Sequence, residues 1–128
     1  MGRCVTPDSI LQFWFAEGPD TPREVWFRKN PEFDASIRDA FAPLLLPARE
    51  GALDDWAATP LGALALLLVL DQFPRNLHRG EAAAFASDAH ARAIAVRLLA
   101  SQQDLLLTPT QRVFAYLPFE HSEAMADQ

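Results

Sequence analysis

Four dipeptides pair a helix-capping residue with a proline, and they constrain the fold more than any other feature of this chain. They are Thr6-Pro7, Asn30-Pro31, Thr59-Pro60 and Thr108-Pro109. The side chain of a cap residue accepts a hydrogen bond from a free N–H group in the first turn of a helix. Proline at the first helical position lacks an N–H that would otherwise be unpaired. Each dipeptide therefore predicts the beginning of a helix.

A fifth beginning near Ser87 completes a set of about five main helices. We predict helices over residues 7–16, 31–49, 60–72, 88–100 and from 109 to the end of the chain. Pro43 and Pro47 should bend or break the second of these. Pro74 should end the third near Gln72, because proline disfavours helical backbone at the residue before it. Alternating patterns typical of strands are absent, so the sequence predicts an all-α fold.

Composition limits the class of protein. The chain has 128 residues, of which 50% are hydrophobic, and this is enough for one domain with a core that needs no disulfide. Its net charge of -6 argues against nucleic-acid binding, and its single cysteine, Cys4, suits a reducing compartment. A secretory signal is absent, and the apolar run of residues 61–70 is shorter than the ~20 residues of a membrane span. We therefore predict one cytoplasmic domain, residues 1–128, that binds neither nucleic acid nor membrane.

The apolar run LGALALLLVL ends in a dense polar segment, DQFPRNLHRG. An acid in the last turn of a helix faces the negative end of the helix dipole, so Asp71 needs a nearby cation. In a structural interpretation, Arg75 or Arg79 pairs with Asp71, and Asn76 bonds the turn. In a functional interpretation, the arginines and amides bind an anionic ligand. The ligand-binding candidates here are Asp71, Gln72, Arg75, Asn76 and Arg79.

A second polar cluster lies in RVFAYLPFEHSEAM, near the end of the chain. On a helix, Tyr116, Glu120 and Glu123 share one face with Arg112, and Tyr116 joins the ligand-binding candidates. His121 lies on a neighbouring, largely apolar stripe, where a histidine is more often a core residue bonded to a carboxylate. Beside two glutamates it could also serve as a general acid–base group. The candidate catalytic residues are His121, Glu120 and Glu123.

Motifs for metals, cofactors and nucleophilic catalysis are absent from the sequence. No HExxH motif or cysteine cluster occurs, and no two histidines are spaced four residues apart on a helix. No G-x-S-x-G turn occurs, and the five glycines are too scattered for a phosphate-binding loop. We predict no metal site and no cofactor.

Five segments together resemble the bacterial family named domain of unknown function 924. They are ILQFWF, WFRKNPEFD, GALDDWAATPLGALALLLVLDQFPRNLHRG, AFASDAHA and YLPFEHSE. The resemblance covers nearly the whole chain. It implies antiparallel helix pairs in a right-handed superhelix similar to tetratricopeptide repeats, although the chain shows no 34-residue period. Family members usually continue into a further helical segment with a motif like RFPHRN, so the resemblance also implies a domain that is incomplete at its C-terminus.

The family name assigns no activity, and two functions remain open. Antiparallel packing of the third and fifth helices predicts a shared network in which Arg75 or Arg79 approaches Glu120 or Glu123, since buried charges need partners. The favoured function is a binding module with a polar pocket or groove for a small acidic ligand or peptide. The alternative is a small hydrolase- or lyase-type enzyme that uses His121 with these charged residues. An exposed apolar face on the last helix also predicts self-association.

Overall fold

The computed structural model describes residues 5–126, and side-chain surroundings are described through residue 121. Within that range there is no strand, which confirms the prediction of an all-α fold. The helices are α1 (Pro7–Trp14), α2 (Pro31–Phe41), α3 (Leu45–Arg49), α4 (Pro60–Leu67), α5 (Phe73–Leu77), α6 (Asp88–Ala100) and α7 (Pro109–Ala126). Short 3-10 turns connect them: η1 (Glu24–Trp26), η2 (Ala42–Leu44), η3 (Asp54–Ala58), η5 (Ala82–Phe85) and η6 (Gln103–Leu106).

All four capping dipeptides begin a helix, as predicted. In each, the cap side chain accepts from the backbone N–H three residues later: Thr6 from Ser9, Asn30 from Phe33, Thr59 from Gly62 and Thr108 from Gln111. The fifth beginning is also confirmed, although Ser87 makes no capping bond with its side chain. Local chemistry therefore sets where the main helices begin.

The third predicted helix does not end at Gln72, and that expectation is wrong. After α4 the chain makes a π-helical turn, η4 (Leu68–Gln72), and continues directly into α5. The N–H of Phe73 reaches back five residues to the carbonyl of Leu68, and Phe73 stays helical although Pro74 follows. The wider turn places Pro74 in the first turn of α5, where the helix does not need its N–H.

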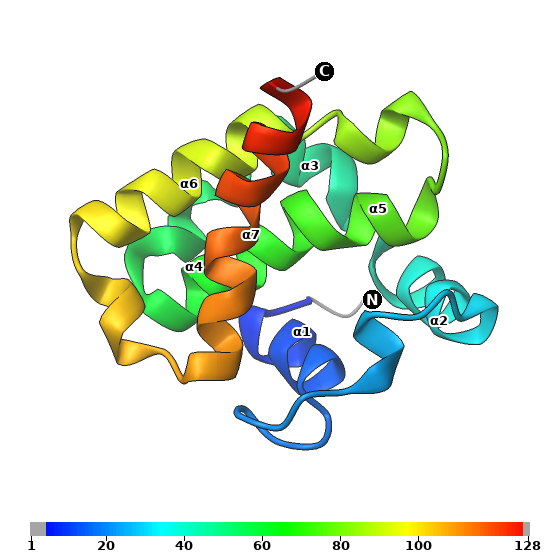
Figure 1. The fold of residues 1–128 in the computed structure, drawn as a ribbon, viewed down its shortest axis with the longest axis horizontal. Coiled ribbons are helices and arrows are strands. Elements are labelled where there is room, and N and C mark those ends of the chain that lie inside the picture. The colour runs from blue at the N-terminus through cyan, green and yellow to red at the C-terminus, as the bar shows by residue number, and fades with distance from the viewer. Residues whose placement is uncertain (1–4, 127–128) are drawn as a thin grey trace.

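The core surrounds α4, which is buried on nearly all sides. Helices α1, α6 and α7 each contact α4, and α6 also packs against α7 (Figure 1). Trp14 of α1 is fully buried and packs against the rings of Phe33, Phe73 and Phe114. Aromatic pairs of this kind add about 0.5–1.5 kcal/mol each beyond the area that they bury. This aromatic centre ties α1, α2, α5 and α7 together around the polar clusters.

The long connection between α1 and α2 is fixed by polar bonds to the rest of the fold. Arg23 donates to the backbone carbonyls of Phe13 and Trp14, and Asp20 accepts from the N–H of Thr110 in the first turn of α7. No helix of residues 5–126 has the length and apolar character that crossing a membrane requires. The superhelix similar to tetratricopeptide repeats stays a prediction.

Candidate functional site

The two polar clusters meet at Asp71, which lies on the π-helical turn and is 1% exposed. Its Oδ1 lies 2.9 Å from Nδ1 of His121 and 3.1 Å from Nη1 of Arg75, and its Oδ2 accepts from the Gln72 amide. Because a carboxylate only accepts, Nδ1 of His121 donates this hydrogen bond. His121 is 24% exposed on its side chain, and Asp71 fixes its ring orientation. The predicted contact between the two segments is therefore present, through the histidine.

Arg75 connects Asp71 to a second acid. Its two terminal nitrogens bind both oxygens of Asp88 at 2.9 Å, in a bidentate pair, and Nη1 also donates to the backbone carbonyl of Asp71 at 2.8 Å. The guanidinium lies 5.4 Å from the ring centre of Phe85 and is 19% exposed. A bidentate pair of this burial is one of the stronger polar contacts in a protein.

Arg79 and Asn76 both bond to Asp34 of α2, apart from the contacts of Asp71. Arg79 donates through Nε to Asp34 at 2.9 Å, and the Asn76 amide donates to the other oxygen of Asp34 at the same distance. Burial raises the pKa of Asp34, but the hydrogen bonds from Arg79 and Asn76 outweigh it. The pKa of this carboxyl is therefore held below its ordinary value of 3.8. Asp34 is 8% exposed, so this is a buried and satisfied charge.

Tyr116 lies in a third polar contact, on α7. Its hydroxyl donates to Oδ2 of Asp104 at 2.8 Å. This hydrogen bond, together with burial, raises the pKa of Tyr116 above its ordinary value of 10.0, because the neutral phenol is the form that donates. The bond joins α7 to η6.

The predicted pairing of Arg75 or Arg79 with Glu120 is wrong. Arg75 bonds to Asp71 and Asp88, Arg79 bonds to Asp34, and Glu120 is an exposed residue. The side chain of Glu123 lies outside the described residues. Tertiary packing places two other acids, Asp88 and Asp34, beside the arginines in place of Glu120 of α7.

Sequence reasoning missed both of these acids. They occupy first turns of helices, where an acid is already explained by the helix dipole. A signal was nevertheless available. Asp34 closes the segment WFRKNPEFD, and Asp88 lies in AFASDAHA, so each belongs to a segment on which the family resemblance rests.

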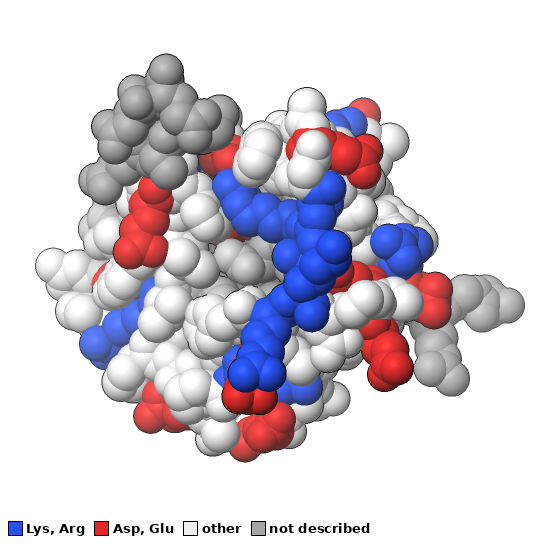
Figure 2. Space-filling view, turned by 45° about the vertical axis from the view of Figure 1, so that its right-hand side comes forward, with Lys and Arg blue, Asp and Glu red and all other residues white. Residues whose placement is uncertain are grey.

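A groove of about 440 Å³ lies beside these pairs, between α2–α3 and α5–η5. Its charged and titratable lining residues are Arg38, Arg49 and His78, and no carboxylate of the described residues lines it. Its other lining residues are Ala42, Leu45, Leu46, Pro74, Leu77, Ala83, Ala86 and Ser87. Neither arginine forms an ion pair with an acid of the described residues. Figure 2 brings the side of α2 and α5 toward the viewer and shows Lys and Arg side chains gathered in a band across this face.

No group of three or more His, Cys, Asp or Glu side chains within the described range is arranged to hold a metal ion. Asp71 and His121 do not line the groove of Arg38 and Arg49. The polar network and the groove are therefore distinct features. They share the segment that follows the π-helical turn, which contributes Arg75 to one and His78 to the other.

Comparison with known proteins gives a family and a fold. A family model described as "Bacterial protein of unknown function (DUF924)" matches residues 10–128. A solved structure, that of the protein of unknown function ATU0120 from Agrobacterium tumefaciens, is similar with a TM-score of 0.83 and 38% sequence identity. The similarity covers 90% of this chain, which spans 63% of the length of that protein. No curated protein matches the chain.

Proposed function

For this chain, which belongs to the bacterial DUF924 family of proteins of unknown function, we propose a binding function. The ligand that we propose is a small amphipathic anion. One observation carries the proposal. Among the described residues, the groove between α2–α3 and α5–η5 is lined by Arg38, Arg49 and His78 and by no carboxylate. In a chain of net charge -6, a concave site with only basic charged groups selects for negative ligands.

The dimensions and walls of the groove favour a small ligand with an apolar body. Its volume of about 440 Å³ lies within the usual range of small-molecule sites, roughly 300–1,000 Å³. Leu45, Leu77 and Pro74 supply apolar surface, and the buried Ser87 also lines the site. A guanidinium suits carboxylate or phosphate, because its planar donors match two oxygens at once. A medium-chain carboxylate fits both requirements.

The polar candidates predicted from the sequence support this function indirectly. Asp71, Arg75, Asn76 and Arg79 satisfy one another or nearby acids within the fold. They rigidify α5, and the other side of the same segment supplies His78 to the groove. A rigid wall lowers the cost of ordering a site when the ligand binds.

Isothermal titration with octanoate tests the proposal. Octanoate should bind, and the neutral 1-octanol should bind more weakly. Arg49→Ala should lower octanoate affinity by about 10- to 100-fold, since a hydrogen bond to a charged group contributes ~1.5–3 kcal/mol. Arg92→Ala, an exposed arginine of α6 outside the groove, is the matched control and should leave affinity unchanged. Equal affinity in wild type and the Arg38→Ala/Arg49→Ala double variant, or no binding of octanoate at millimolar concentration, would refute the proposal.

A catalytic function of hydrolase or lyase type is the second candidate, and the Asp71–His121 hydrogen bond supports it. A buried carboxylate that holds Nδ1–H leaves Nε2 of a neutral imidazole able to accept a proton. Turnover of chromogenic carboxylic and phosphate esters should then be lost in His121→Ala. The matched control is His90→Ala, because His90 forms a similar pair with Asp54 at 2.7 Å elsewhere in the fold. Turnover that is absent, or independent of His121, argues against the candidate.

A further inference from the structure

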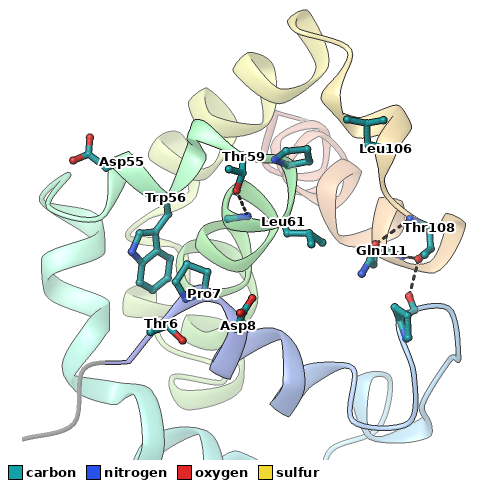
Figure 3. A pocket seen from close by; sticks show the side chains of 13 residues that line it. Thr6, Pro7, Asp8, Asp55, Trp56, Thr59, Leu61, Leu106, Thr108 and Gln111 are labelled. Atoms are coloured by element: carbon teal, nitrogen blue, oxygen red, sulfur yellow. Dashed lines mark hydrogen bonds between the residues drawn. The ribbon is translucent and has the colours of Figure 1, made fainter.

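A second cavity, of about 820 Å³, lies where α1, α4 and α7 begin, and it shares no lining residue with the arginine groove (Figure 3). Three of the four Thr-Pro and Asn-Pro caps surround it, those of Thr6, Thr59 and Thr108. The proposed anion-binding function makes no use of this cavity.

Two contacts fix the wall of the cavity. A Cβ added to Gly62 would lie 2.0 Å from the backbone oxygen of Trp56, so the first turn of α4 rests directly on η3 and only glycine fits there. Gln111 is 6% exposed and its Oε1 accepts from the N–H of Thr108 at 3.0 Å. The amide nitrogen of Gln111 has no hydrogen-bond partner among the described residues, and Figure 3 shows it directed away from Thr108. A donor is therefore held in place and left free.

The rim of the cavity exposes large apolar side chains. Leu106 is 76% exposed and Leu61 is 47% exposed, and both line the cavity together with Trp56. Figure 3 shows Trp56 on one side and Leu106 on the other. A smaller hollow of about 260 Å³ shares Asp8, Leu61 and two further residues with the cavity and is also lined by Phe15. Two adjoining hollows can each take a side chain of one ligand, which suits a peptide more than a compact molecule.

The charges of the cavity also point to a ligand of mixed polarity. Asp8 and Asp55 line it, and none of the described Lys, Arg or His residues does. The three helix N-termini contribute roughly half a positive charge each and favour oxygen acceptors in their vicinity. An isolated anion would be repelled by the two carboxylates, and a small cation would not use the donors. A peptide offers carbonyl oxygens, apolar side chains and a basic side chain in one molecule.

We propose that this cavity binds an extended peptide segment of a partner protein, in which apolar side chains flank a Lys or Arg. The apolar side chains pack against Trp56, Leu61 and Leu106. The basic side chain pairs with Asp55 or Asp8, and a peptide carbonyl accepts from the amide of Gln111. Recognition thus combines apolar burial with one charge and one directed hydrogen bond.

Selection of random heptapeptides displayed on phage against the full chain tests the proposal. Enriched sequences should carry Lys or Arg next to Leu, Ile, Val or Phe. For the enriched peptide, measured by fluorescence polarisation, Leu106→Ser should weaken binding by about tenfold. Asp55→Asn should weaken it by a smaller factor, up to about fivefold, with a reduced dependence on salt.

Leu105→Ser is the matched control, since Leu105 is the neighbouring residue, is 58% exposed and does not line the cavity. This variant should bind like the wild type. The proposal is overturned if no sequence is enriched, if acidic sequences are enriched, or if the two leucine variants lose equal affinity. It is also overturned if light scattering shows that a second copy of the chain occupies the site, with wild type dimeric and Leu106→Ser monomeric.

Discussion

Replacing Arg75 by alanine should destabilise the fold strongly, because Arg75 is the shared partner of two acids. Its guanidinium makes four hydrogen bonds, two to Asp71 and two to Asp88, and it is 19% exposed. Without it, the carboxylate of Asp71, which is 1% exposed, keeps only Gln72 and His121. Breaking a buried pair in this way costs about 3–5 kcal/mol, chiefly because a buried charge loses its partner.

The magnitude converts into a measurable shift of the unfolding midpoint. The unfolding entropy of a chain of 128 residues is roughly 0.27 kcal/mol/K, from about 2.1 cal/mol/K per residue. Dividing the loss of stability by this entropy gives the shift of the midpoint. Arg75→Ala should therefore lower the midpoint in thermal denaturation by about 10–20 °C. Arg92→Ala, at an exposed position of α6, should change it by about 2 °C or less. An unchanged or raised midpoint for Arg75→Ala would show that Arg75 does not hold the fold together.

Burial of Asp34 is outweighed by the hydrogen bonds that it accepts, which hold its folded-state pKa below the unfolded-state value. The stabilisation is therefore present above the unfolded-state pKa and is lost as pH falls through the lower folded-state pKa. Arg79→Ala should raise that pKa in an NMR carboxyl titration, and its destabilisation should be present at pH 7 and disappear at acid pH. Tyr116 is the single tyrosine, so ultraviolet titration should place its pKa above 10.0, and Asp104→Asn should lower it; an equal pKa in both proteins would contradict the contact. Val113 on α7 is 43% exposed. Light scattering over a dilution series should show self-association that Val113→Lys weakens, whereas a monomeric wild type at high concentration would exclude it.

Helix beginnings were predictable from the sequence because their chemistry is local. A threonine or asparagine oxygen reaches an N–H only three residues away, and the following proline acts on its own backbone. The breaks after Phe41 follow from Pro43 and Pro47 for the same reason. None of these features depends on how distant helices pack. The buried position of Trp14 could also be expected from its place on an apolar helix face.

The local ion pair of Arg75 with Asp71 was predictable from their spacing, but the long-range ion-pair partners were not. Arg75 and Arg79 lie four residues apart, yet one reaches α6 and the other reaches α2. The choice depends on the direction in which each side chain leaves α5 and on the acids that packing brings within about 4 Å. Asp88 lies 13 residues from Arg75 in the chain, and Asp34 lies 45 residues from Arg79. Charge balance indicates that partners exist, and only the tertiary arrangement identifies them.

The π-helical turn explains why the helix does not end before Pro74. It also explains why the polar contacts gather around Asp71. The proline rule treats the residue before Pro74 as non-helical, but a turn closed over five residues lets Phe73 stay helical and the chain continue. As a result, Asp71 lies inside a continuous helical path, where it is buried, and not at an exposed helix end. A buried carboxylate needs donors from other elements, and His121 of α7 is one of them. The joining of the DQFPRN and YLPFEHSE segments is therefore a consequence of this widened turn.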